Sequence, residues 1–98
     1  MSYQDIVAED CRLVILKALA KEPDHRLNET VLTRVLEQFG HLKSREYVRT
    51  QIRKLEELGA VKVAVAGSVL VPQLLQAGLD HVQRRAFIEG VGRPSLEG

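Results

Sequence analysis

The stretch SREYVRTQIRKLEELGAVKVAVAGSVLV, residues 44–71, decides the fold because the spacing of its apolar residues changes once along it. Up to Gly59 the apolar residues keep a helical period, with Ser44 placed as an N-cap and a buried stripe formed by Val48, Ile52, Leu55 and Leu58. After Gly59, valines alternate at 61, 63 and 65, and Gly67-Ser68 separates them from a second valine-rich run. The stretch therefore predicts a helix over 44–58 followed by a β-hairpin with a two-residue type II′ turn.

Two further helices are predicted upstream of this stretch. Asn28 is a favourable N-cap for the nearer helix, and Glu29 follows it at a position where the helix dipole favours an acid. Gly40 is placed to end that helix with a positive φ, and residues 40–43 form a short turn to the helix over 44–58. The stripe expected to be buried is Val31, Leu32, Val35, Leu36 and Phe39. The first helix spans about residues 5–20, and its expected buried face is Val7, Cys11, Val14, Ile15, Ala18 and Leu19.

Downstream of the hairpin, Pro72 is expected to end the second strand, and a last helix is predicted over roughly 75–88. The residues expected to be buried on it are Leu75, Leu79, Val82 and Ala86. The glycine- and proline-containing segment 90–98 is predicted to be a flexible C-terminal tail. The fold class predicted is thus mainly α with a small β-hairpin, in the order helix, helix, turn, helix, hairpin, helix, with a single domain over 1–89.

Length and charge narrow the class of protein. The 98 residues suffice for one domain, and a single cysteine excludes an intrachain disulfide. No apolar run approaches the roughly 20 residues of a membrane span, and acidic residues interrupt the region where a signal peptide would be apolar. We therefore expect a cytoplasmic protein with no membrane partner. The net charge is only +1, so a positive field for nucleic acid would have to be local.

The stretch SREYVRTQIRKLEELGAV resembles the third helix and first wing strand of bacterial winged helix-turn-helix regulators of the ArsR and MarR type. LLQAGLDHVQ resembles the start of their last helix, although Leu75 stands where those proteins have a capping threonine. Over nearly the whole chain, the sequence is similar to small proteins of Mu-like prophages labelled ArsR-like regulators, through RLVILKALA, RLNE, the same third-helix stretch and VGRPS. The resemblance implies a winged helix-turn-helix fold and a phage-derived regulator of transcription.

The helix over 44–58 is the candidate recognition helix, because a helix-turn-helix presents the start of this helix to the major groove of double-stranded DNA. Arginines stand near its start and glutamates near its end, which is the reverse of what the helix dipole favours and suggests a negatively charged partner. The alternative is a solvated face whose arginines pair at helical spacing, Arg49 with Glu46 and Arg53 with Glu56 or Glu57. The candidate DNA-binding residues are Lys43, Ser44, Arg45, Arg49, Thr50 and Arg53.

The hairpin tip, Ala66-Gly67-Ser68-Val69, carries no lysine or arginine, so useful DNA affinity would require a homodimer that reads two half-sites. Ile6, Leu13 and Leu16 lie off the main stripe of the first helix and pack either within the chain or on a second copy. The alternative function is a protein-interaction module with a phage or host protein partner, in assembly or as an adaptor.

Nothing in the sequence predicts catalysis or a metal site. Cys11 lacks a second cysteine and falls on a buried stripe, where a small hydrophobic role is expected. His25, His41 and His81 lie in three different elements without ligand spacing. Because there is also no phosphate-binding glycine loop and no nucleophile motif, we expect a protein that is not an enzyme and uses no cofactor.

Overall fold

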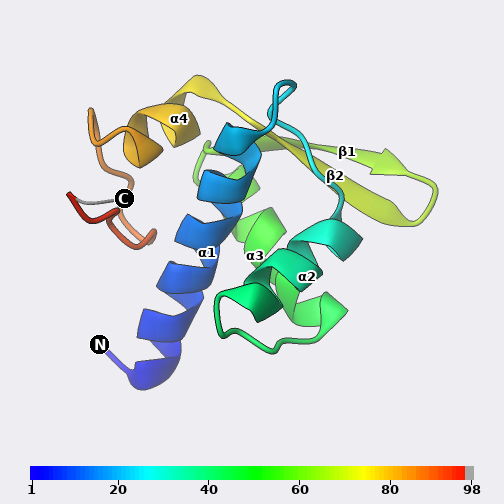
Figure 1. The fold of residues 1–98 in the computed structure, drawn as a ribbon, viewed down its shortest axis with the longest axis horizontal. Coiled ribbons are helices and arrows are strands. Elements are labelled where there is room, and N and C mark those ends of the chain that lie inside the picture. The colour runs from blue at the N-terminus through cyan, green and yellow to red at the C-terminus, as the bar shows by residue number, and fades with distance from the viewer. Residues whose placement is uncertain (97–98) are drawn as a thin grey trace.

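The computed structural model describes residues 1–96. The elements are α1 (Tyr3–Lys21), α2 (Glu29–Gln38), α3 (Arg45–Glu57), β1 (Val61–Ala66), β2 (Val69–Leu74) and α4 (Gln76–Val82). The protein is mainly helical, and the two strands form one antiparallel hairpin that extends beyond the helices (Figure 1). The order of the elements matches the sequence prediction. Within the described residues, no helix combines the length and the apolar character needed to cross a bilayer.

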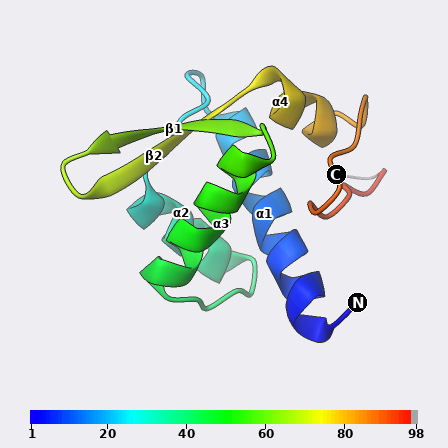
Figure 2. The same cartoon turned by 180° about the vertical axis from the view of Figure 1, so that it is seen from behind.

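The helix α1 lies at the centre, with α2 and α3 on one side and α4 on the other (Figures 1 and 2). Of the three apolar residues off the main stripe of α1, Leu13 and Leu16 are buried in the core of their own chain, whereas Ile6 is exposed. A core of leucine, isoleucine and valine from every element except the hairpin tip encloses the middle of α1. The off-stripe leucines of α1 therefore pack within the chain.

The predicted caps of α2 and α3 are confirmed. The Val31 N–H donates to Asn28 Oδ1 at 2.9 Å, and the Tyr47 N–H donates to Ser44 Oγ at 3.1 Å. Gly40 and Gly59 follow these helices with φ of 88° and 78°, in the region where only glycine is unstrained. These local signals set the length of both helices and of the turn between them.

The expected burial of the α2 stripe is wrong at its two ends. Leu32 and Leu36 are fully buried, whereas Val31 is exposed and Phe39 keeps 56% of its surface. Phe39 lies past the last residue of α2, where the backbone leaves the helical path, so its ring is carried away from the core. An apolar flank of α2 therefore faces solvent.

The hairpin has the predicted two-residue turn, with Ala66 paired to Val69 and Gly67 at φ 63°. The expectation that Pro72 ends the second strand is wrong, because β2 continues to Leu74 and Pro72 pairs with Val63. The reason lies in the direction of the backbone N–H groups. The N–H groups of Leu70 and Leu74 point away from β1, to Glu29 Oε1 and to the His25 carbonyl, and Pro72 lies between them on the same side. The missing N–H of Pro72 therefore costs no hydrogen bond with β1.

The last helix is shorter than predicted. It ends at Val82, Arg84 takes a positive φ of 62°, and Ala86 is exposed instead of buried. The chain turns back because the buried His81 ring holds it. Its Nδ1 accepts the N–H of Ile88 at 2.9 Å, and its Nε2 lies 2.8 Å from the carbonyl oxygen of Gly92. These hydrogen bonds take the place of the backbone hydrogen bonds that a helix continued to residue 88 would have made.

Residues 90–94 pack against α1, which differs from the flexible tail predicted over 90–98. Arg12 Nη1 donates to the Gly90 carbonyl at 2.6 Å, the Gly92 N–H donates to the Glu9 carbonyl at 3.0 Å, and Val91 is buried. Arg84 donates to the Pro94 carbonyl. The packed part of the domain thus extends past the predicted boundary at 89, and residues 97–98 of the predicted tail lie outside the described part of the chain.

Candidate functional site

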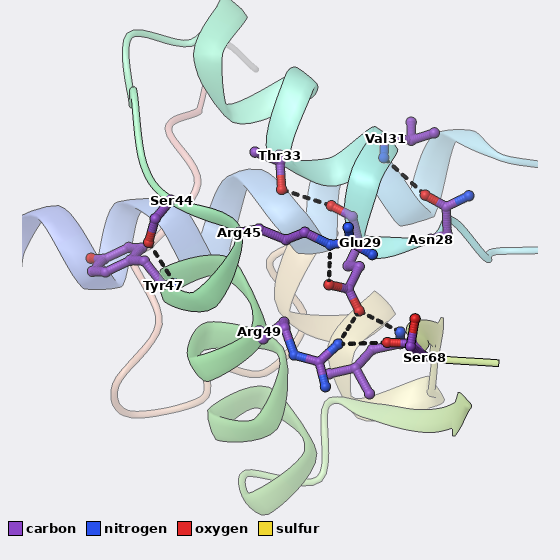
Figure 3. Close-up of polar contacts among 10 residues, drawn as sticks. Asn28, Glu29, Val31, Thr33, Ser44, Arg45, Tyr47, Arg49 and Ser68 are labelled. Carbon is purple, nitrogen blue, oxygen red and sulfur yellow. Dashed lines mark hydrogen bonds and ion pairs between the residues drawn. The ribbon is translucent and has the colours of Figure 1, made fainter. Parts of the chain in front are cut away.

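A buried carboxylate, Glu29, joins α2, α3 and the hairpin. Its Oε2 accepts from Arg45 Nε at 2.7 Å, and its Oε1 accepts from Arg49 Nη1 at 2.5 Å (Figure 3). The same Oε1 accepts the backbone N–H of Leu70 at 2.5 Å. The side chain of Glu29 is 0% exposed. Two arginines that the sequence singled out for DNA are therefore tied to an acid inside the protein.

Each member of this cluster is placed by its own element. Glu29 is the first residue of α2, directly after the cap Asn28, and its carbonyl accepts from Thr33 Oγ1 at 2.8 Å. Arg45 and Arg49 stand four residues apart, so they share one face of α3. The N–H of Leu70 points away from β1 and would otherwise lack a partner. One carboxylate thus satisfies donors from two elements distant in sequence.

The charge of Glu29 is stabilised despite its burial. Burial raises the pKa of this carboxyl group, but the Leu70 N–H and the guanidinium groups of Arg45 and Arg49 outweigh that effect, and the pKa lies below its ordinary value. The group is therefore ionised at neutral pH. Because one carboxylate faces two guanidinium groups, the cluster keeps one net positive charge.

Both arginines remain accessible from outside. Their side chains are 47% exposed for Arg45 and 39% exposed for Arg49. Arg49 Nη1 also donates to the Ser68 carbonyl at 3.0 Å, which fastens the hairpin tip to α3. The alternative pair of Arg49 with Glu46 does not form, because Glu29 holds Arg49 instead. Within the part of the chain that the structure describes, neither Nη atom of Arg45 has a hydrogen-bond acceptor, and Nη2 of Arg49 has none either.

The other candidate residues lie along or just before α3 with different partners. The Ser44 hydroxyl is used as the N-cap, and Lys43 Nζ lies 5.0 Å from the centre of the Tyr47 ring. Thr50 is exposed, and its Oγ1 donates to the Glu46 carbonyl at 3.1 Å. Arg53 Nη1 pairs with Glu56 Oε1 at 2.9 Å, as the solvated-face alternative expected.

A groove of about 410 Å³ runs between α3 and the hairpin and brings three of the candidates together. Its lining is Glu46, Arg49, Thr50, Arg53, Lys54, Glu57 and Leu70. The structure thus groups Arg49, Thr50 and Arg53 on one surface, with Arg45 beside Arg49 on Glu29, whereas Lys43 and Ser44 do not line the groove. The surface carries charges of both signs.

The buried role of Glu29 was missed by the sequence analysis, which assigned this residue only to the helix dipole. Its partners stand 16 and 20 positions away, beyond any helical spacing. One signal was present, because two arginines near the start of a helix run against the helix dipole and suggest a negatively charged partner. The residue that supplies it could be found only from the packing of α2 on α3.

The remaining reactive side chains do not form a second site. Over residues 1–96, no cluster of three histidine, cysteine, aspartate or glutamate side chains could hold a metal ion. Cys11 is fully buried, and burial raises the pKa of its thiol. His41 Nε2 lies 2.6 Å from Asp10 Oδ2, far along the chain from His81 and its own partners.

Residues 1–96 thus form a small, mainly helical domain with one antiparallel hairpin and a charged surface along α3, where a buried acid anchors a pair of arginines. Comparison with known proteins then gives its family. The chain is 40% identical over 90 residues to uncharacterized protein gp26 of Escherichia phage Mu. These 90 residues cover 92% of this chain and 93% of gp26. The chain belongs to the family of this phage protein, in agreement with the resemblance to Mu-like prophage proteins.

A second relative comes from Haemophilus influenzae. It is an uncharacterized protein with 36% identity over 63 residues, which cover 64% of this chain and 61% of the relative. No protein-family model matches the chain. No solved structure matches it either. The names of both relatives state no activity, so a function has to be argued from the site.

Proposed function

We propose that this protein is a winged helix-turn-helix domain that binds double-stranded DNA and regulates transcription of phage genes in the bacterial cytoplasm. The observation that carries the proposal is the pair Arg45 and Arg49 at the start of α3, half exposed and held with a net positive charge. In a helix-turn-helix this is the part of the recognition helix that enters the major groove. The recognition helix would be the segment 44–58.

The order of the elements supports the same proposal. The helices α2 and α3 are joined by a short turn, and the hairpin follows α3 directly, as a wing would. The tip of this wing carries no cation, and the Ser68 carbonyl is engaged by Arg49. The hairpin therefore supports α3 and contributes few contacts of its own to DNA.

The affinity of a single chain would be modest. A net charge of +1 and a few phosphate contacts predict weak binding that falls steeply with salt. A homodimer that reads two half-sites would multiply this affinity. The proposal therefore includes dimerisation on DNA.

A protein-interaction module is the second candidate, and exposed apolar side chains favour it. Val31, Phe39 and Leu42 are exposed on α2 and on the turn after it, and Tyr3 and Ile6 are exposed at the start of α1. Apolar surface of this kind marks protein contacts when it is contiguous. A phage or host protein would then cover it in place of DNA.

Binding to random duplex DNA at about 50 and 200 mM salt tests the proposal, because phosphate contacts weaken strongly over this range. We expect clear binding at the lower salt and a steep loss at the higher one, measured by fluorescence anisotropy. The variant Arg45→Gln should weaken binding, whereas Arg85→Gln, an equal change of charge on the exposed turn after α4, should weaken it less. Folded protein that fails to bind at low salt would contradict the proposal and favour the protein-interaction module.

A further inference from the structure

We propose that Arg45 and Arg49 form a clamp for the phosphodiester backbone of DNA, preset by Glu29, and that sequence is read by Thr50 and Arg53. This inference rests on the proposed DNA binding and assigns separate roles within its surface. It differs from the usual expectation that arginines at the start of a recognition helix contact guanine edges.

The first argument is the position of the two guanidinium groups. Both turn toward a carboxylate that is fully buried, at 2.7 Å for Arg45 and 2.5 Å for Arg49. To reach a base edge, either side chain would have to extend away from α3 and leave these bonds. Glu29 would then keep a buried charge with fewer partners, which is strongly unfavourable. The arginines therefore stay close to the helix, within reach of the DNA backbone.

The second argument is the chemistry that this position leaves available. A guanidinium group has five N–H donors, and Glu29 accepts only one from each arginine. The exposed nitrogens of two guanidinium groups on consecutive turns of α3 offer several donors beside a net positive charge, as Figure 3 shows for their common face. A phosphate group accepts several such bonds, and arginine suits this geometry better than lysine. Contacts of this kind position a protein on DNA without reading sequence.

The third argument concerns two other candidates on α3, Thr50 and Arg53. Among the residues that the structure describes, Arg53 pairs with the exposed Glu56. An exposed ion pair of this kind has little energetic consequence, so Arg53 can exchange this partner for a base. Thr50 is exposed and its hydroxyl oxygen can still accept a hydrogen bond. Both side chains line the groove between α3 and the hairpin. Both side chains can move toward base edges without leaving a buried charge behind.

The test compares a duplex selected from a random pool with the random pool itself, over a range of salt concentrations. Arg45→Gln should weaken binding to both DNAs by the same factor, leave their affinity ratio unchanged, and lower the slope of log K against log salt by about 0.9 per lost phosphate contact. Arg53→Gln should lower the affinity ratio instead. Arg45→Gln should stay folded because Arg49 still pairs with Glu29, and circular dichroism checks this.

The conservative variant Arg49→Lys separates a phosphate contact from a base contact. A lysine still meets a phosphate as a point charge, so the salt slope and the affinity ratio should both persist. A fall in the affinity ratio for Arg49→Lys or Arg45→Gln would overturn the clamp while leaving DNA binding intact. If the unaltered protein binds neither DNA, the proposed function and the clamp both fail.

Discussion

The substitution Glu29→Gln should destabilise the fold by about 2–3 kcal/mol. The change keeps the shape of the side chain but removes the charge that accepts from Arg45, Arg49 and Leu70. Removing one partner of a buried ion pair costs about 3–5 kcal/mol when the other charge stays buried. Here the arginines are half exposed, so water can solvate them, and the amide oxygen can still accept from Leu70. The loss should therefore fall below that range.

Thermal and urea unfolding followed by circular dichroism measure this loss, which corresponds to a fall in Tm of about 10–20 °C for a domain of this size. The matched control is Glu56→Gln, the same chemical change in an ion pair at 2.9 Å whose side chains are 48% and 40% exposed. That variant should lose no more than about 0.5 kcal/mol. Equal losses for the two variants would refute the reasoning that Glu29 is the anchor of α3 and the hairpin.

Three further predictions follow from the packing and the charges. Gly78→Ala should destabilise the protein by about 1–3 kcal/mol in urea unfolding, because the new carbon would lie 2.5 Å from a backbone oxygen. Ala77→Ser on the same helix should stay within about 0.5 kcal/mol, and equal midpoints for the two variants would contradict the close contact. In the folded protein, the pKa of Glu29 lies below its ordinary value of 4.5. The stability that its charge contributes is therefore complete above pH 4.5 and is lost as the pH falls through the lower pKa of the folded state. Urea midpoints measured from about pH 7 to about pH 3 should therefore fall more steeply in the acid range for the unaltered protein than for Glu29→Gln. Parallel curves for the two proteins would contradict a stabilising charge on Glu29. Truncation after residue 89 should lower Tm because it removes the buried Val91 and the contacts to α1; an unchanged Tm in the shorter chain would mean that segment 90–94 does not support the core.

Local sequence signals predicted the part of the fold that depends on near neighbours. Several of these signals act within a few residues and appear in the structure as predicted. They are the caps Asn28 and Ser44, the glycines that end α2 and α3, and the change from helical to strand spacing of apolar residues at Gly59. The two-residue turn of the hairpin is local in the same sense. The order of the helices and the hairpin within residues 1–96 could therefore be predicted from sequence.

The errors in α4, in segment 90–94 and at the candidate site concern contacts that lie beyond the i to i+4 spacing of a helix. The length of α4 depends on His81, whose ring is hydrogen-bonded to the backbone of Ile88 and Gly92. The spacing of apolar residues cannot predict these hydrogen bonds. The packing of segment 90–94 depends on Arg12 and Glu9 in α1, about 80 positions earlier. For the candidate site, the sequence indicated Arg45 and Arg49 as DNA-binding candidates but did not predict that the buried Glu29 anchors both of them. The DNA contacts themselves stay a prediction.

The direction of the N–H groups along β2 also bears on how this protein avoids unwanted association. An open strand edge recruits further strands through its unpaired N–H groups. On the outer side of β2, the donor of Leu70 is taken by Glu29, Pro72 has none, and the donor of Leu74 is taken by His25. This edge therefore offers an incoming strand no donor between residues 70 and 74. Strand addition would have to use β1, where Lys62 carries a charge that discourages it.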